Sequence, residues 1–89
     1  MTEPPLPLEP RRRRILYRAT HRGTAESDRL IGGFVAAKIA TMDEAGLAAL
    51  ERVLALPDPD LVAWILGRQP IPPEHDEPVL RAIRDAARR

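Results

Sequence analysis

Cysteine is absent from this chain of 89 residues, and the two histidines, His21 and His75, lie far apart in it. Without cysteine the chain has no disulfide, no thiolate nucleophile and no thiolate metal ligand. Two distant histidines give no recognisable metal-binding spacing, so we expect no metal site. Apolar runs stay well short of the roughly 20 residues that span a membrane, and the charged start lacks the apolar stretch of a signal peptide. We therefore expect a cytoplasmic protein that does not insert into a membrane.

Aromatic side chains and nucleophiles are also scarce. Trp, Tyr and Phe occur once each, and the chain contains a single serine. The carboxylates Glu26, Asp28 and Glu51 are paired with no nucleophile, so we interpret them as first-turn anions and a solvated helix face. A chain of this length forms one small domain with a thin core, which cannot spare packing for a deep substrate pocket. The sequence predicts a protein that is not an enzyme and has no catalytic residues.

Proline divides the chain into a tail and one helical domain. Four of the ten prolines fall in the first ten residues, so we expect residues 1–11 to be a disordered tail and residues 12–89 to fold. No segment alternates apolar and polar residues as a strand would, whereas apolar residues recur at helical spacing. The predicted fold is an all-α, small five-helix bundle.

Capping residues and glycines mark the ends of the helices. Thr24 is the expected N-cap of the second helix, and Thr41 opens the third in a capping box with Glu44. Asp58 is the expected N-cap of the fourth helix, and Gly67 suits the left-handed position after it. The five helices are expected at 12–21, from 24 through 39, from 41 onward, at 59–66 and at 74–87.

The apolar positions of these helices predict the core. Gly32 and Gly33 reduce helix stability, so we expect them to mark a close helix crossing. Trp64 closes the segment Asp-Pro-Asp-Leu-Val-Ala-Trp and is the expected aromatic anchor of the core. The other candidate core residues are Ile15, Leu16, Ala19, Leu30, Ile31, Phe34, Val35, Ile39, Leu47, Leu50, Val53, Leu54, Val79, Leu80 and Ile83.

Positive charge is concentrated near the N-terminus. The net charge is +1, but residues 1–23 carry +4 and residues 24–89 carry −3. The run of four arginines at 11–14 leaves open a small nucleic-acid-binding or transcription-associated module, which would show steeply salt-dependent binding. Single-strand binding also uses aromatic platforms, and these are scarce here. We interpret the run as a solvated basic arm at a helix start and expect no nucleic-acid partner.

Residues 17–26 contain a candidate contact site. A helix ends there, and Arg22 and Glu26 flank Gly23 in an Arg-Gly-x-x-Glu pattern. Such a corner can expose Arg22 and lets another backbone approach Gly23 closely. An Arg22–Glu26 ion pair that only fastens the corner is the alternative interpretation.

In this order and at this length, the motifs resemble one family. A basic first helix precedes Arg-Gly-x-x-Glu and an acidic residue, and a third helix ending in Leu-Pro precedes Asp-Pro-Asp-Leu-x-x-Trp. The chain is similar, over about residues 12–84, to the succinate dehydrogenase assembly factors, the flavinylation factors called SdhE in bacteria. His21 stands where that family often has a second arginine, and Gly33 where a larger residue is usual. Outside this resemblance, an antitoxin-like adaptor with an unrelated partner is a further alternative.

The resemblance implies a function and a set of contact residues. Members are soluble five-helix proteins that bind the flavoprotein subunit of succinate dehydrogenase, and in some bacteria that of fumarate reductase. They promote covalent attachment of FAD to that subunit, so the FAD belongs to the partner and the chain holds no cofactor stably. A member is expected in the bacterial cytoplasm, as a monomer when free. The implied partner-binding residues are Tyr17, Arg18, Arg22, Gly23, Glu26 and Asp28.

The expected contact has one role for each residue of the motif. Arg22 would bond carbonyls or carboxylates of the partner, Gly23 would allow close approach, and Glu26 would orient Arg22 or bond the partner itself. On this hypothesis Arg22→Ala and Gly23→Arg leave the helical fold intact and abolish function.

Overall fold

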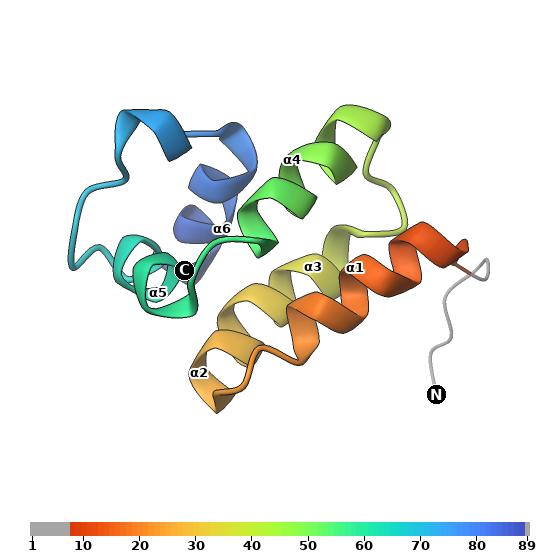
Figure 1. The fold of residues 1–89 in the computed structure, drawn as a ribbon, viewed down its shortest axis with the longest axis horizontal. Helices are drawn as coiled ribbons and strands as arrows, with labels where there is room; N and C mark the ends of the chain where they lie inside the picture. The colour runs from red at the N-terminus through yellow and green to blue at the C-terminus, as the bar shows by residue number, and fades with distance from the viewer. Residues whose placement is uncertain (1–7, 89) are drawn as a thin grey trace.

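A computed structural model describes residues 8–88, which form an all-helical domain (Figure 1). Within these residues the α2, η1 and α3 elements run on without a break as one helix, so the predicted five-helix bundle is confirmed. Of the disordered tail expected at residues 1–11, residues 1–7 lie outside the described residues, and the expectation is wrong for residues 10 and 11, which are helical because α1 begins at Pro10. The elements are α1 (Pro10–Thr20), α2 (Ala25–Ser27), the π-helical turn η1 (Asp28–Gly32), α3 (Gly33–Lys38), α4 (Glu44–Leu54), α5 (Asp58–Ile65), the 3₁₀ turn η2 (Pro73–His75) and α6 (Pro78–Ala87).

The helices pack in an order that follows the chain. In Figure 1, α1 and the helix formed by α2, η1 and α3 run side by side, and α5 and α6 lie at the other end of the molecule. The α4 helix contacts both α1 and α6 and so joins the two halves. None of the helices in residues 8–88 combines the length and apolarity that a membrane crossing requires.

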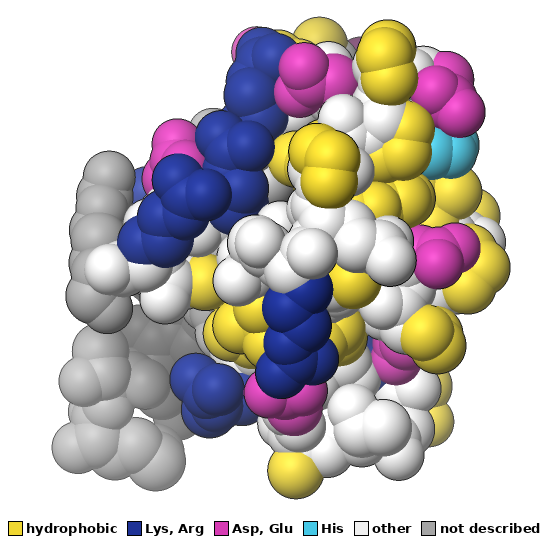
Figure 2. All heavy atoms as spheres, turned by 90° about the vertical axis from the view of Figure 1, so that its left-hand side faces the viewer, with side chains coloured by type: hydrophobic (Ala, Val, Ile, Leu, Met, Phe, Trp, Pro, Cys, Tyr) yellow, Lys and Arg dark blue, Asp and Glu magenta, His cyan; other side chains and the backbone are white. Residues whose placement is uncertain are grey.

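The core consists of the apolar faces that the sequence predicts. Leu16, Leu30 and Phe34 are half-buried at its edge, and Trp64 is buried and stacks on His75 with ring centroids 5.5 Å apart. Tyr17 and Leu66 are the large apolar side chains that stay exposed among the described residues. On the face that carries α5, Lys and Arg side chains lie next to Asp and Glu side chains (Figure 2). The buried apolar residues are Ile15, Ala19, Ile31, Val35, Ile39, Leu47, Ala49, Leu50, Val53, Leu54, Leu61, Trp64, Ile65, Val79, Leu80 and Ile83.

A close crossing of two helices occurs at Gly32 but not at Gly33. A Cβ atom on Gly32 would lie 2.9 Å from Cγ2 of Thr20 and 3.0 Å from the carbonyl oxygen of Ala19. A Cβ atom on Gly33 would meet nothing within 4 Å, since this residue is exposed. The expectation that both glycines mark a crossing is therefore confirmed for Gly32 and wrong for Gly33.

Two of the predicted helix ends are confirmed. The side chain of Thr24 accepts a hydrogen bond from the Ser27 amide at 3.1 Å, as an N-cap does. Gly67 follows α5 with φ +74°, the left-handed conformation expected of it.

Three other predicted helix starts are wrong. Asp43, and not Thr41, caps α4 by accepting a hydrogen bond from the Gly46 amide at 2.8 Å. The α5 helix begins one residue early, so Pro57 takes the cap position and Asp58 lies in the first turn. The last helix begins at Pro78, because proline disfavours helical backbone in the residue before it.

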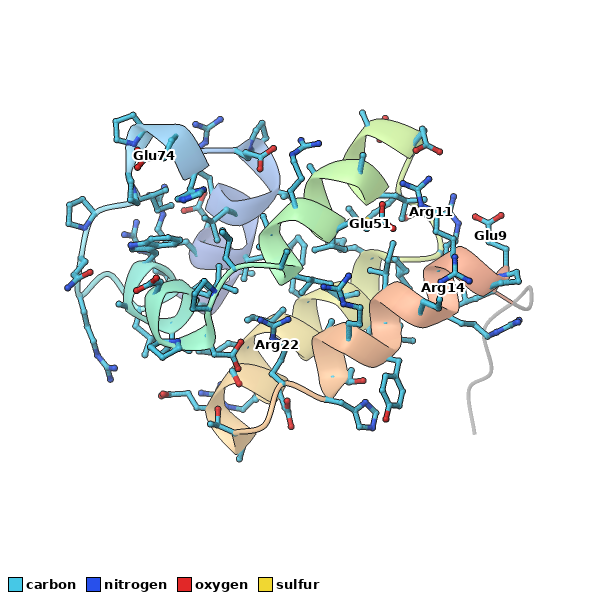
Figure 3. All side chains as sticks on the ribbon, in the orientation of Figure 1. Glu9, Arg11, Arg14, Arg22, Glu51 and Glu74 are labelled. Atoms are coloured by element: carbon cyan, nitrogen blue, oxygen red, sulfur yellow. The ribbon has the colours of Figure 1, made fainter. Side chains whose placement is uncertain are left out.

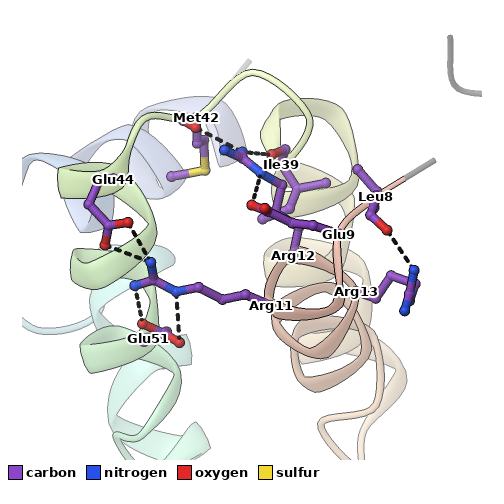
Figure 4. A network of polar contacts seen from close by, with 9 residues as sticks. All are labelled: Leu8, Glu9, Arg11, Arg12, Arg13, Ile39, Met42, Glu44 and Glu51. Atoms are coloured by element: carbon purple, nitrogen blue, oxygen red, sulfur yellow. Dashed lines mark hydrogen bonds and ion pairs between the residues drawn. The ribbon is translucent and has the colours of Figure 1, made fainter. Parts of the chain in front are cut away.

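Two arginines of the 11–14 run fasten α1 to its neighbours. Arg11 donates to Glu44 at 2.6 Å and to Glu51 at 2.7 Å, both on α4 (Figures 3 and 4). Arg12 donates to the carbonyl oxygens of Ile39 at 2.6 Å and Met42 at 2.8 Å, just after α3 (Figure 4). A cation is favourable at the C-terminal end of a helix. The interpretation of the run as a solvated arm is therefore wrong for Arg11 and Arg12, because α1 begins early enough to turn them toward these acceptors.

The two adjacent glycines provide a matched test of the crossing. We expect Gly32→Ala to lower the free energy of unfolding by about 1–3 kcal/mol, because its Cβ atom overpacks the contact with α1. Gly33→Ala has open space and helical backbone, so it should raise that free energy by up to about 1 kcal/mol. Urea denaturation of both variants measures the difference. Equal effects of the two substitutions would contradict the crossing.

The Arg11–Glu51 contact predicts a pH dependence. Hydrogen bonding to Arg11 lowers the pKa of Glu51 below its ordinary value of 4.5. A carboxylate with a lowered pKa stabilises the fold above its unfolded pKa, and this contribution is lost as the pH falls through the folded pKa. We expect Glu51→Gln to flatten the loss of stability between about pH 5 and pH 3. Thermal melts across this range measure the effect, with Glu74→Gln on the exposed η2 turn as control. If Glu51→Gln changed the pH dependence of stability no more than Glu74→Gln does, the prediction would be contradicted.

Candidate functional site

Residues 21–28 form a tight corner between α1 and α2. Gly23 has φ +110°, a backbone conformation that side chains with a Cβ atom rarely adopt. A Cβ atom at this position would still meet nothing within 4 Å. The corner therefore needs glycine for its backbone, while the space outside it is free for another molecule.

The side chain of Arg22 turns from this corner into the molecule (Figure 3). It is only 9% exposed and contacts Asp58 at 2.5 Å, at the start of α5. It also donates to the carbonyl oxygens of Leu54 at 2.7 Å and Leu56 at 3.2 Å, at the end of α4. The expectation that the corner exposes Arg22 is therefore wrong.

The alternative interpretation, an Arg22–Glu26 ion pair that fastens the corner, is also wrong. Glu26 is exposed and accepts no hydrogen bond from a side chain of residues 8–88. The end of α4 and the Asp58 carboxylate together offer Arg22 three acceptors in a shielded place. A single exposed carboxylate competes poorly with them, since surface ion pairs contribute little.

Ser27 and Asp28 complete the contacts around Arg22. The hydroxyl of Ser27 is fully buried and donates to the second carboxylate oxygen of Asp58 at 2.9 Å. The Asp28 carboxylate accepts a hydrogen bond from the Arg22 amide at 2.5 Å, which fixes the backbone on one side of Gly23. Asp28, expected to contact a partner, thus stabilises the corner from within.

The electrostatics of two helix ends favour this arrangement. The Arg22 guanidinium lies at the C-terminal end of α4, where the carbonyls carry partial negative charge, and Asp58 lies in the first turn of α5, where the amides carry partial positive charge. One ion pair therefore stabilises the ends of two helices and the turn between them. Arginine suits this position because its planar group donates in several directions at once.

The outer surface of the corner carries the other predicted residues. Tyr17, Arg18, Gly23 and Glu26 are all exposed. Tyr17 is 63% exposed and stacks on His21, with ring centroids 3.9 Å apart and planes at 15°. Two shallow hollows flank the Arg22–Asp58 pair. One is lined by Tyr17, Arg18, His21, Leu56 and Pro57, and the other by Gly23, Thr24, Glu26, Pro59 and Val62.

The sequence analysis missed Asp58 and Ser27 as parts of this site. Asp58 precedes a proline, which is the usual sign of a helix cap, and this pattern concealed its contact with Arg22. The co-occurrence of the Arg-Gly-x-x-Glu and Asp-Pro-Asp-Leu-x-x-Trp motifs was the available signal, because each contributes one charge to the same pair. Residues 8–88 bring together no group of three or more His, Asp or Glu that could hold a metal ion.

The buried position of Arg22 predicts a cost in stability. We expect Arg22→Ala to lower the free energy of unfolding by about 3 kcal/mol, because it leaves Asp58 and the α4 carbonyls without their donor. Arg81→Ala is the matched control, since the Arg81–Asp76 pair is exposed and should contribute less than about 1 kcal/mol. Urea denaturation compares the two, and equal costs would contradict the proposed anchoring. The earlier expectation that Arg22→Ala spares the fold is revised accordingly.

Comparison with known proteins identifies a family. The sequence profile of the family described as "Flavinator of succinate dehydrogenase" matches residues 13–87. A protein of Acetobacter pasteurianus named FAD assembly factor SdhE is 48% identical over 81 residues, which are 91% of this chain and 74% of that protein.

Mitochondrial proteins named succinate dehydrogenase assembly factor 2 are also similar. The Arabidopsis thaliana protein is 40% identical over 74 residues, covering 81% of this chain and 39% of that protein. The Dictyostelium discoideum protein is 34% identical over 77 residues, covering 86% and 55% respectively. This chain thus spans about half or less of these two mitochondrial relatives. Because the family profile matches most of the chain, the chain belongs to the family of succinate dehydrogenase flavinators.

Proposed function

We propose that this chain is an assembly factor that binds the flavoprotein subunit of succinate dehydrogenase and promotes covalent attachment of FAD to it. Membership of the flavinator family supports this proposal. The observation that carries it further is the corner at Gly23, whose backbone is held from inside while its outer face stays open. The same role toward fumarate reductase is part of the proposal for bacteria that contain that enzyme.

The site divides into residues that touch the partner and residues that hold the site in place. In this proposal Tyr17, Arg18, Gly23 and Glu26 contact the flavoprotein subunit, because they are exposed around one corner. Arg22 and Asp28 are positioning residues, because their polar groups are engaged within the chain. A surface fixed in advance pays less conformational entropy on binding than a flexible one.

The proposed mechanism is differential binding. A helper protein shifts a conformational equilibrium only by binding one state of its partner more tightly than the others. A difference of about 1–3 kcal/mol favours the competent state of the subunit about 5- to 150-fold. This role needs no catalytic residue and no cofactor on the chain, so the FAD and its chemistry belong to the subunit. The proposal places a free monomer of this chain in the bacterial cytoplasm.

Substitutions at Gly23 test the contact with the subunit. Gly23→Ala and Gly23→Arg share the strain of a positive φ, about 1–3 kcal/mol, but only the arginine projects far into the space outside the corner. We expect Gly23→Arg to abolish covalent flavin on the subunit and Gly23→Ala to retain most of it. Flavin fluorescence on denaturing gels measures the attachment in cells that lack the native factor. Matched losses in the two variants would contradict the contact.

Glu26 gives a control that avoids backbone strain. Its side chain is exposed, so Glu26→Gln should leave the thermal melt within a degree or two of wild type. We expect this variant to bind the subunit more weakly and to slow flavin attachment. Deleting the factor altogether tests the proposed function itself. Unchanged covalent flavin in such cells, with normal amounts of the subunit, would contradict it.

A further inference from the structure

One face of α1 carries positive charge that the fold does not use. Residues at positions 13, 14, 17, 18 and 21 are exposed and follow one another around the helix at i, i+1, i+4, i+5 and i+8. This spacing places them on a single face. We call this surface the α1 strip; it consists of Arg13, Arg14, Tyr17, Arg18 and His21.

The arginines of the α1 strip differ from their neighbours in having no acidic partner among the residues that the structure describes. Within residues 8–88, Arg11 and Arg12 form ion pairs with Glu44, Glu51 and Glu9, whereas Arg13, Arg14 and Arg18 form none. The Arg13 guanidinium donates only to the Leu8 carbonyl, at 2.6 Å, which leaves its charge unpaired.

The Glu51 carboxylate on α4 is not available to the arginines of the strip. Arg11 already pairs with it at 2.7 Å. Neither Arg14 nor Arg18 forms an ion pair with Glu51 or with another carboxylate of residues 8–88. The surface around the strip is therefore positive on balance.

An ordered aromatic group lies in the middle of this positive face. The Tyr17 ring is held by its stack on His21, and the Nδ1 atom of His21 lies 2.9 Å from the Tyr17 carbonyl oxygen and 3.1 Å from the Thr20 hydroxyl. An exposed aromatic ring that is fixed in advance can bury much area at a low entropic cost. The ring also borders the hollow lined by Leu56 and Pro57, so the strip continues into the corner at Gly23.

We propose that the α1 strip docks onto an acidic surface of the flavoprotein subunit, with its arginines facing carboxylates and Tyr17 as the central anchor. This inference rests on the proposed function and extends its contact surface from the corner along α1. Charges at the rim of an interface mainly speed association and make it salt-dependent, and a buried aromatic anchor mainly slows dissociation. The strip should therefore guide the chain onto the subunit, and Tyr17 should retain it there.

The composition of the strip favours a protein partner over a nucleic acid. Nucleic-acid binding relies on several phosphate contacts spread over a surface. Here only three arginines without an acidic partner in residues 8–88 lie on one short helix face, and residues 24–89 carry −3. One side of the Tyr17 ring is already covered by His21, which leaves a single face for stacking. Three charges beside one aromatic anchor match a small acidic patch on a folded protein.

The test measures association of the chain with the purified flavoprotein subunit of succinate dehydrogenase. Association rates are recorded from about 0.01 M to about 0.3 M salt, over which the screening length shortens from roughly 30 Å to less than 10 Å. We expect the wild-type rate to fall steeply with salt. The double variant Arg14→Glu, Arg18→Glu should associate about tenfold or more slowly at low salt and lose most of the salt dependence. Tyr17→Ala should instead raise the dissociation rate about tenfold or more.

The matched control places the same charge change elsewhere. Arg68 and Arg88 are exposed and form no ion pair within residues 8–88. They follow α5 and α6, the two helices at the other end of the molecule from α1 (Figure 1). Arg68→Glu, Arg88→Glu should therefore associate within about twofold of wild type. Arg14→Gln, Arg18→Gln provides a second version of the strip variant that places no new acid beside Glu51, and it should show the same direction of change.

Three outcomes would overturn the inference, and they point to different errors. If the strip variants bind the subunit with the same rate and the same salt dependence as wild type, the docking role of the α1 strip alone is contradicted. Absence of any binding between wild type and the subunit contradicts the proposed function on which the strip depends. Equally tight binding of wild type to a mixed-sequence DNA duplex at 0.15 M salt, lost in the strip variants, would assign the strip to a nucleic acid.

Discussion

The contact between Arg22 and Asp58 is the interaction on which the rest of the site depends. It joins the corner after α1 to the end of α4 and the start of α5, which lie 32 to 36 residues further along the chain. The pair is largely shielded from solvent, at 9% and 19% side-chain exposure, and both charges also face helix ends that favour them. The cost of removing them from water is thus offset by several partners at once.

This contact separates two roles that a single motif combines. In Arg-Gly-x-x-Glu, the arginine points inward, the glycine shapes the backbone, and the glutamate stays in solvent. The inward residue keeps the outward ones in a fixed geometry, so a surface of few residues is ordered without a deep core beneath it. A small domain can present a rigid binding surface in this way because the end of one helix supplies carbonyl acceptors and the start of the next supplies amide donors, which the chain must satisfy in any case.

The helices and the core could be predicted from the sequence because both follow from local periodicity. Leu47, Leu50 and Val53 recur at helical spacing, and burying them on one side of α4 leaves little choice of orientation. Gly67 was equally predictable, because a helix end needs a left-handed residue that few others can provide.

The long-range polar contacts could not be predicted, because a charged side chain has many acceptors within reach. Arg22 and Glu26 belong to the same short motif, but Arg22 binds Asp58, which is 36 residues away in the sequence. Arg11 and Arg12 looked like a solvated arm until the position of α4 and the end of α3 supplied their acceptors. The N-cap of α4 is Asp43 and not the predicted Thr41. Either side chain can accept a hydrogen bond from a backbone amide, and the path of the loop after α3 places Asp43 at the cap position.

The close approach at Gly32 also has a consequence for how the sequence can change over evolutionary time. Two of the three atoms nearest to a Cβ at this position belong to the backbone of α1, so a smaller residue at position 20 would not make room for it. Position 32 should therefore stay glycine across related chains whatever stands at position 20. Position 33 faces open space and is free to drift. Two identical neighbouring residues are therefore expected to differ in how freely they can be replaced.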